Sequence, residues 1–271
     1  MISNHLLCLG FGYTAQALAR ELLAEGWRIS ATFRDPRKAP AAIEASAFPP
    51  PADDSVTHIL CSIPPEANGD PALPLLPAYK NLRWTGYLSA TSVYGDHAGA
   101  WVDEEAICAP TSARGHNRLK AEQQWQAGTP AAHIFRLAGI YGPGRNALQD
   151  IRAHTAKRID APGVLFSRIH VADIVATLQA SMRQPAPVRI YNVADDEPAA
   201  SHEVVSYACT LLGVAPPPLV PLARAHLSPM AAEFYRDSKR IGNERIKSEL
   251  GVSLRYPTYR DGLNACHADG D

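Results

Sequence analysis

The chain has 271 residues, 46% of them hydrophobic, and a formal net charge of −1 at pH 7. This length is enough for one large α/β domain that buries a core without disulfide or metal staples, and the near-zero charge gives no reason to expect nucleic acid as a partner. Five widely spaced cysteines without a C-x-x-C pair indicate neither a disulfide framework nor a zinc site.

We expect neither a targeting signal nor a membrane segment. Met1 to His5 lack the basic stretch of a secretory leader, and no apolar run approaches the length of a membrane span. The acidic run from Asp103 to Glu105 has no histidine at ligand spacing, so a solvated loop is expected there. These features predict a cytoplasmic protein with neither a membrane partner nor a bound metal.

The first predicted strand runs into a glycine turn. An apolar stretch and an amphipathic helical pattern flank a turn made of Gly10, Phe11, Gly12, Tyr13, Thr14 and Ala15. Strand, G-x-G-x-x-A and helix in this order are typical of the phosphate-binding corner of a dinucleotide fold. Gly10 would allow the tight turn, Gly12 would let the backbone approach the pyrophosphate, and Ala15 would let helix and strand pack closely. The first helical N–H groups would then face the phosphates. An ordinary turn is the alternative, since the motif is short.

The second predicted strand, residues 27–33, bears on the choice of cofactor. It ends without the Asp or Glu that holds the ribose 2′-hydroxyl in NAD sites. Thr32 lies near its end, and Arg34 and Arg37 offer positive charge where a 2′-phosphate would lie, which arginine binds bidentately. We predict NADP as the cofactor, with NAD as the alternative. A solvated basic loop is the other interpretation of these arginines.

Strand and helix patterns alternate along the remaining chain. Strand patterns occupy residues 56–63, 84–93, 132–137 and 188–193, and helical patterns occupy residues 110–126, 171–182 and 237–250. This alternation predicts an α/β fold with a doubly wound parallel sheet, a Rossmann fold. The stretch before Val56 is short and rich in Ala and Pro, so one strand–helix unit is expected to be trimmed. Ser62, Ile63 and Pro64 end a strand at the sheet's carboxyl edge, where open α/β sheets bind ligands, and are predicted cofactor contacts.

Four later segments carry a family resemblance. They read L-S-A-T-S-V-Y-G (88–95), F-R-L-A-G-I-Y-G-P-G-R (135–145), R-I-H-V-A-D-I (168–174) and Y-N-V-A-D-D-E-P (191–198). In this order they resemble the extended short-chain dehydrogenase/reductase superfamily of the NAD-dependent epimerase/dehydratase type, from about residue 5 to about residue 262. The glycine turn departs from that family's three glycines at threefold spacing and is more like an atypical subgroup.

The resemblance implies a domain organisation. A Rossmann domain would occupy residues 1–165, and the last sheet elements with a small C-terminal substrate lobe would occupy residues 166–271, in one compact unit with a discontinuous boundary. A cleft between them would bind a small-molecule substrate. Members of this superfamily often pair through helices, which implies a homodimer.

This chain departs from the family at the catalytic residues. The family helix reads S-P-Y-G-x-S-K-L-x-x-E, whereas the matching segment here reads S-A-R-G-H-N-R-L-K-A-E, so Arg114 stands at the Tyr position and Arg118 at the Lys position. Ala90 stands at the family's Ser or Thr position. A frame shifted by two residues pairs His116 with Lys120 instead but loses two matches. Arginine does not release a proton near neutral pH, so Arg114 cannot act as the acid/base.

Other residues are candidates for the missing chemistry. Arg118 is expected to hold the nicotinamide ribose or a phosphate, and Arg114 and Arg118 on one helix face could hold an anionic group, the alternative being two surface arginines. Thr91 adjoins the lost hydroxyl and is a candidate to supply one. His170 is a candidate acid/base because its pKa range suits proton transfer, and a role in a helix-cap region is the other interpretation.

The resemblance also implies contacts along the cofactor and the substrate. Ala90, Leu137 and Gly139 fall where the family backbone passes the nicotinamide. Arg145 and the pair Lys239–Arg240 are candidates to meet an anionic substrate, with exposed surface as the plainer expectation. Together the residues and the resemblance predict an NAD(P)-binding atypical extended short-chain dehydrogenase/reductase. It would be an oxidoreductase or epimerase/dehydratase-like enzyme on a small polar, anionic or sugar-nucleotide substrate. The alternative is a catalytically silent NADP-binding sensor or partner-binding module.

Overall fold

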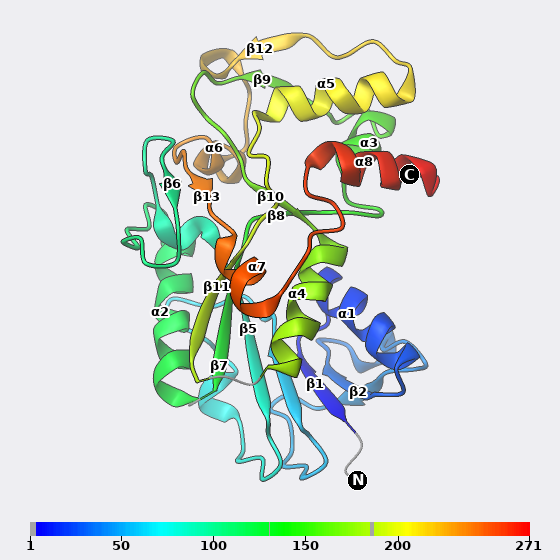
Figure 1. Cartoon of the computed structure of the whole chain (residues 1–271), viewed down its shortest axis with the longest axis vertical. Coiled ribbons are helices and arrows are strands. Elements are labelled where there is room, and N and C mark those ends of the chain that lie inside the picture. Colours follow the sequence, from blue (N-terminus) through cyan, green and yellow to red (C-terminus); the bar gives the residue numbers. More distant parts are fainter. Residues whose placement is uncertain (1–3, 130, 185–186) are drawn as a thin grey trace. The chain divides into compact units, whose positions relative to one another are not determined.

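The computed structural model describes residues 4–129, 131–184 and 187–271 (Figure 1). Met1 to Ser3, on which part of the expectation about targeting signals rests, lie outside the described residues. The chain divides into two compact units that each use three stretches of sequence. The first unit contains Met1–Val93, Ala113–Arg136 and Val175–Tyr191, and the second contains Tyr94–Ser112, Leu137–Ile174 and Asn192–Asp271. The boundary expected between residues 165 and 166 stays a prediction.

A seven-stranded sheet runs in the order β11-β7-β5-β4-β1-β2-β3. Its strands are β1 (His5–Leu9), β2 (Arg28–Thr32), β3 (Glu44–Ser46), β4 (His58–Cys61), β5 (Trp84–Ala90), β7 (Ala132–Leu137) and β11 (Arg189–Val193). β1 pairs in parallel with β2 and with β4, in registers that align Leu7 with Ser30 and Leu7 with Ile59. Every residue of β1 is buried, as expected for a central parallel strand covered on both faces. The predicted α/β fold with a doubly wound parallel sheet is confirmed.

The alternating side chains of β5 distinguish the two faces of this sheet. On one face Trp84 Nε1 donates to Ser181 Oγ of α4 (Val171–Arg183) at 2.9 Å. On the other face Tyr87 stacks on Trp125 of α2 (Ala113–Gly128), with 5.8 Å between the ring centroids. Because successive strand residues point to opposite faces, α2 and this part of α4 cover opposite faces. Helix α1 (Tyr13–Ala24) lies on the α4 side, where Gln179 Nε2 of α4 donates to Oε1 of Glu25, the residue that follows α1, at 2.9 Å (Figure 1).

The link between β3 and β4 contains no helix in the structure, which describes all of residues 47–57. Three consecutive prolines, Pro49 to Pro51, occupy this link, and proline removes the N–H that a helix interior needs. The expectation of a trimmed strand–helix unit between the second strand and Val56 agrees with this arrangement. One side of the sheet near β3 is therefore covered by irregular chain instead of a helix.

The second unit is built from short elements. Its strands form three parallel pairs: β8 (Gly139–Tyr141) with β10 (Arg168–His170), β9 (Arg158–Asp160) with β12 (Leu219–Pro221), and β6 (Trp101–Val102) with β13 (Arg240–Ile241). Its further helices are α3 (Ala147–Arg152), α5 (Ser201–Leu212), α6 (Pro229–Phe234), α7 (Glu244–Leu250) and α8 (Tyr259–Ala268). A core cluster of buried residues joins α3, α5 and α8 through Leu148, Val204, Ala208, Tyr259 and Leu263.

The helix predicted over residues 237–250 is wrong in its first half. Only residues from Glu244 onward are helical, as α7. The preceding amides bond instead to β6 and to the residue before it, because Arg240 N donates to Ala100 O at 2.9 Å and Gly242 N donates to Val102 O at 2.8 Å. Pairing with a strand distant in sequence thus overrides a local helical pattern.

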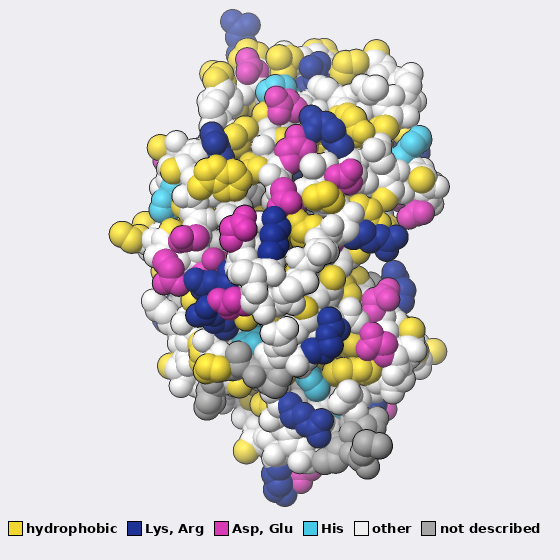
Figure 2. All heavy atoms as spheres, viewed as in Figure 1, with side chains coloured by type: hydrophobic (Ala, Val, Ile, Leu, Met, Phe, Trp, Pro, Cys, Tyr) yellow, Lys and Arg dark blue, Asp and Glu magenta, His cyan; other side chains and the backbone are white. Residues whose placement is uncertain are grey.

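Figure 2 shows acidic and basic side chains interspersed over the visible face, without a large area of one sign among the described residues. No described helix combines the length and the hydropathy needed to cross a bilayer.

Candidate functional site

Gly10 is required by the fold itself. It follows β1, and its φ of +82° lies in the left-handed region that side-chain-bearing residues avoid. A β carbon at this position would lie 3.1 Å from both Ser62 Oγ and Ile63 Cγ1, tighter than most real contacts. The turn after β1 therefore needs glycine for its conformation and for the approach of the residues that follow β4.

Neighbouring strands hold this turn in place. Gly10 N donates to Thr32 Oγ1 at 2.9 Å, and Ser62 Oγ donates to Gly10 O at 3.1 Å. Gln16 Nε2, from α1, donates to Phe11 O at 3.0 Å. Thr32 and Ser62 were predicted from the sequence as cofactor contacts, and the structure places them beside the glycine turn, where they fix its backbone. The structure thus brings the turn, the end of β2 and the residues after β4 together.

Gly12 has a different environment from Gly10. Its φ of −84° is one that any residue adopts, and a β carbon there would meet no described atom within 4 Å. Neither backbone conformation nor packing within the described chain requires glycine at this position. Open space beside backbone at the start of a helix is what a bound pyrophosphate needs, so the residues present fit a dinucleotide.

The start of α1 offers an electropositive surface. Gly12 is its N-cap, and among the described residues no side chain caps this end. The first turn carries no acidic residue, so the positive end of the helix dipole is not neutralised there. Thr14 and Ala15 are buried, and Ala15 is 0% exposed. A small residue at this position allows the close packing of helix on strand that the motif predicts.

The basic residues after β2 differ in their surroundings. Arg37 Nε lies 2.9 Å from Asp35 Oδ1, and its hydrogen bonds lower the pKa of that carboxyl. Asp35 also accepts from Arg37 N at 3.2 Å and so caps the short 3-10 helix Pro36–Lys38. Arg34 is exposed and makes no ion pair with another described residue. The charge of Arg37 is therefore balanced locally, and Arg34 and Lys38 carry the excess positive charge.

Arg118 is tied to β5. Its Nη1 donates to Leu88 O at 2.9 Å and to the Tyr87 hydroxyl at 3.3 Å. No described residue accepts a hydrogen bond from its Nε or Nη2, so these two nitrogens of the guanidinium can still donate to a ligand. Arg114 is exposed one turn earlier on α2, and a separation of four residues puts both arginines on one helix face.

A buried ion pair fixes α2 one turn further along. Glu122 is 0% exposed and Arg136 is 3% exposed. Arg136 Nη2 lies 2.8 Å from Glu122 Oε2, and Ser89 Oγ donates to Glu122 Oε1. Leu88 and Ser89 therefore each bond to α2, through Arg118 and Glu122. The sequence does not predict this pair, although Glu122 is the last residue of the segment that matches the family helix.

The other residues predicted for the site are distributed over both units. The first unit contains Ile63 and Pro64 after β4, Ala90 at the end of β5, and Thr91 in the 3-10 helix Thr91–Tyr94. The second unit contains Leu137, Gly139 and His170. Leu137 is buried at 5% exposure, and Gly139 lies on β8, where its N donates to Ser167 O at 3.1 Å.

His170 is packed among other side chains. It is 4% exposed, and its Nδ1 accepts from Ala172 N at 3.2 Å. Its ring lies 4.1 Å from that of Tyr256, and its Nε2 lies 3.9 Å from Cys266 Sγ. Burial, with a smaller effect from Arg255, lowers the pKa of His170 to about 4. The ring is thus neutral at pH 7, and its role as an acid/base stays a prediction.

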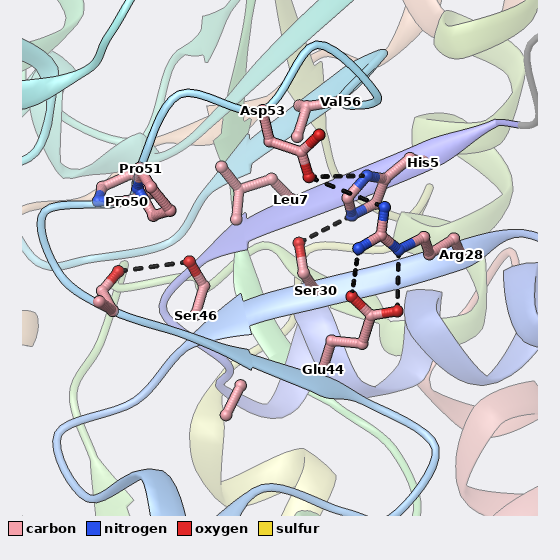
Figure 3. A pocket seen from close by; sticks show the side chains of 12 residues that line it. His5, Leu7, Arg28, Ser30, Glu44, Ser46, Pro50, Pro51, Asp53 and Val56 are labelled. Atoms are coloured by element: carbon pink, nitrogen blue, oxygen red, sulfur yellow. Dashed lines mark hydrogen bonds and ion pairs between the residues drawn. The ribbon is translucent and has the colours of Figure 1, made fainter.

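A pocket of about 210 Å³ lies at the other end of the strands (Figure 3). His5 and Arg28, at the amino ends of β1 and β2, line it together with Glu44, and His5 Nε2 lies 2.8 Å from Ser30 Oγ. Arg28 binds Glu44 with two hydrogen bonds of 2.8 and 2.6 Å. Ligands of open α/β sheets bind at the carboxyl ends of the strands, so this pocket is not the candidate cofactor site. It lies where the helix between β3 and β4 is missing.

No family model matches the sequence. The chain is 28% identical over 179 residues to Protein YeeZ of Escherichia coli K12, an alignment that covers 63% of this chain and 58% of YeeZ. It is 29% identical over 143 residues to a 3-diazoavenalumate denitrifying reductase of Streptomyces sp., which covers 49% of this chain and 46% of the reductase. The matched region thus spans about half the length of these curated relatives.

Solved structures resemble the chain over almost its whole length. A functionally unknown conserved protein from Silicibacter pomeroyi is 49% identical, with a TM-score of 0.94 over 98% of this chain and 99% of that one. A Methylobacillus flagellatus structure named for the NAD-dependent epimerase/dehydratases is 24% identical, with a TM-score of 0.75 over 99% of each chain. Human epimerase family protein SDR39U1, solved with NADPH, is 16% identical, with a TM-score of 0.80 over 98% of this chain and 99% of that one. The chain belongs to the same family as the Silicibacter pomeroyi protein, and its fold is that of the NAD-dependent epimerase/dehydratases.

Proposed function

We propose that this chain is an NADP(H)-dependent reductase that acts on a small polar substrate with an anionic group. Gly12 carries the proposal, because nothing within the described chain requires glycine there and a dinucleotide pyrophosphate does. The uncapped start of α1 and the turn fixed by Thr32 and Ser62 support the same binding site. The NADPH in the SDR39U1 structure, which shares the fold, agrees with it.

NADP is favoured over NAD by the end of β2. No acidic residue stands at the strand end, and Arg34 is exposed there without an ion-pair partner among the described residues. A guanidinium in this position can bind a 2′-phosphate with two parallel hydrogen bonds. Arg37 contributes less, because Asp35 already balances its charge.

Reduction is favoured over epimerisation or dehydration by the residues at the family's catalytic positions. Those two reactions begin by removing a proton from a substrate hydroxyl, and neither Arg114 nor Arg118 can accept it. The bound nicotinamide would supply the hydride for a reduction, and solvent water would supply the proton that the resulting alkoxide takes up, whereas removing a proton from a hydroxyl needs a base that these positions lack. Arg118, with free Nε and Nη2 donors, would bind the cofactor ribose or a phosphate, and Arg114 would bind the anionic group of the substrate. The name of the Streptomyces relative, a reductase, points the same way.

The first test is a fluorescence titration of the protein with NADPH and with NADH. We expect Arg34→Ala to weaken NADPH binding by about tenfold or more, a change of about 1.4 kcal/mol, and to leave NADH binding unchanged. Arg37→Ala is the matched control, because its charge is already paired and its loss should matter less. If wild type binds neither nucleotide, the proposal is wrong.

The second test is turnover with NADPH on carbonyl compounds that carry a carboxylate or a phosphate. Arg114→Ala should raise KM for these compounds more than for uncharged carbonyls. NADPH binding without any turnover would instead support the second candidate function, a cofactor sensor without catalysis. The replacement of the family's Ser, Tyr and Lys by Ala90, Arg114 and Arg118 is the observation that favours that candidate.

A further inference from the structure

A carboxylate of the chain itself occupies a cluster of hydrogen-bond donors in the second unit. Asp271 Oδ2 accepts from Gly144 N and from Asn146 Nδ2, each at 2.7 Å, and its Oδ1 accepts from Gln149 Nε2 at 2.9 Å. All three donors are uncharged amide groups. Hydrogen bonds from such groups to an ionised acceptor are stronger than those between two neutral groups. The three amides therefore form a cluster that suits an oxyanion.

The turn before α3 leaves one backbone N–H for this cluster. Gly142 and Arg145 bond to each other in both directions, each with an N to O distance of 3.0 Å. Pro143 between them has no N–H, and Gly144 has a φ of +70°, which favours glycine. The Gly144 amide is thus the remaining donor of the turn, and it bonds to Asp271. Arg145, which the sequence predicts as a candidate for an anionic substrate, is exposed in the same turn.

Asn146 gives the cluster a rigid and buried base. It is 8% exposed, and its Nδ2 also donates to Gly142 O at 2.9 Å. Its Oδ1 accepts from Leu148 N at 2.9 Å and from Gln149 N at 3.2 Å. These two helix amides are therefore already bonded, and the cluster consists of a turn amide and two side-chain amides instead of a helix end. Because these bonds do not involve Asp271, they should keep Asn146 oriented when that carboxylate leaves.

Asp271 reaches the cluster through the turn that ends α8. Gly270 has a φ of +95°, its N donates to His267 O at 3.2 Å, and Asp271 N donates to Cys266 O at 2.9 Å. Two such bonds around a glycine in the left-handed conformation form a Schellman motif, which turns the chain away from the helix. Residues 267–270 are exposed, so the carboxylate can leave the donors without disturbing the core that joins α3, α5 and α8.

We propose that Gly144, Asn146 and Gln149 form a binding site for a small oxyanion, a phosphate or a carboxylate group, and that Asp271 is its built-in competitor. This inference does not rest on the proposed reductase function, since all four residues belong to the second unit. A tethered group acts at an effective concentration of the order of millimolar, so it excludes weakly binding anions and yields to a tightly binding one. A ligand with such a group therefore binds by displacing Asp271.

The test is a phosphate titration of isotope-labelled protein, followed by NMR at constant ionic strength and without nucleotide. The Gly144 amide and the Gln149 side-chain amide report this site, and the Gly12 amide reports the candidate dinucleotide site separately. We expect Asp271→Ala to lower the phosphate concentration at half-saturation by about tenfold or more, because the competitor is gone. A titration with acetate shows whether the site prefers a carboxylate, and saturation by either anion with this gain in Asp271→Ala supports the proposal.

Asp269→Ala is the matched control, because it removes an exposed carboxylate that lies outside the donor cluster. Its phosphate titration should match that of wild type. Adding Gln149→Ala to Asp271→Ala should weaken phosphate binding by about tenfold, since one bond to the charged group is lost.

Equal half-saturation in wild type and Asp271→Ala would show that the carboxylate only ties the end of α8 to the turn, and would overturn the proposal. An equal gain in Asp269→Ala would overturn it too, because the gain would then come from net charge. Movement of the Gly12 amide without movement of the Gly144 amide would also contradict this site, and would leave the proposed dinucleotide site intact.

Discussion

The hydroxyl of Thr32, at the end of β2, accepts the amide proton of Gly10, in the turn after β1, at 2.9 Å. This bond joins the two strands at the edge where the nucleotide is proposed to bind. Thr32 is 4% exposed, so its hydroxyl is shielded from water and bonds to the backbone of the turn. The geometry of the phosphate-binding turn thus depends on a side chain from a neighbouring strand as well as on its own glycines.

Thr32→Val should therefore affect both folding and binding. The substitution keeps the shape of the side chain but leaves the Gly10 N–H without its partner, at a cost of about 1–3 kcal/mol in the free energy of unfolding. NADPH binding should weaken as well, because the turn is no longer held. Urea denaturation and fluorescence titration measure the two effects. Thr32→Ser, which retains the hydroxyl, is the control, and a Val variant with wild-type stability would show that the bond contributes little.

The two glycines of the turn should respond in opposite ways. Gly10→Ala forces a β carbon into a left-handed backbone beside Ser62 and Ile63, so we expect a loss of at least about 1–2 kcal/mol in unfolding free energy. Gly12→Ser meets no such clash and supplies a better N-cap, so stability should stay equal or rise by a few tenths of a kcal/mol.

NADPH binding should nevertheless be lost in Gly12→Ser, because its side chain fills the space proposed for the pyrophosphate. Urea denaturation of both variants, together with NADPH titration of Gly12→Ser, makes the comparison. Unimpaired NADPH binding by a stable Gly12→Ser protein would count against the dinucleotide site itself.

Acid should destabilise the fold through its buried histidines. Burial lowers the pKa of both His58 and His170 to about 4, from the ordinary histidine value of 6.5. The neutral forms are favoured in the folded state, so this stability is fully present above pH 6.5 and is lost as the pH falls toward 4. Each histidine should account for about 3 kcal/mol of that loss.

Urea midpoints measured between pH 7.5 and 4 test this expectation. His170→Gln should flatten the pH dependence by roughly its own share. A wild-type urea midpoint that stays constant across this range would contradict the expectation.

The buried ion pair of Glu122 and Arg136 should be sensitive to the loss of one partner. Glu122→Gln leaves a buried guanidinium without its counter-charge, and we expect a loss of about 3–5 kcal/mol in unfolding free energy. The double variant Glu122→Met with Arg136→Met removes both charges and should recover most of this stability. Chemical denaturation of the two proteins tests the prediction. A single variant that is no less stable than the double one would be inconsistent with a buried, paired charge.

The sequence predicts the elements whose signals are local. The apolar run of β1, the glycine turn and the buried stripe of α1 follow one another within about twenty residues, and all three are found. The sequence does not predict β13, whose two residues are strand only because they pair with β6 more than a hundred positions earlier. The same limit applies to Lys239, for which the sequence favours an exposed position, whereas its side chain is 12% exposed and bonds to Gly95 O.

The sequence predicts where the candidate cofactor site lies, but it does not predict which of the basic residues there have their charge balanced by a neighbour. Arg34 and Arg37 are equivalent in the sequence, and only the hydrogen bonds of Asp35 distinguish them. Arg118 likewise was predicted as a ligand-binding residue, whereas its contact with Leu88 O depends on the packing of α2 on β5. Such differences come from side-chain geometry, which periodicity and spacing do not encode.

Residues 47–57, which stand in place of a helix between β3 and β4, also affect whether two copies of the protein can pair at the edges of their sheets. β3 is the edge strand of the sheet and has three residues, and Pro49 to Pro51 follow shortly after it. An exposed strand edge is a template on which a second molecule can add its own strand. A three-residue edge offers few unpaired backbone groups, and the prolines after it have no N–H with which to extend the ladder. The same irregular segment that borders the pocket thus protects the sheet from edge-to-edge aggregation.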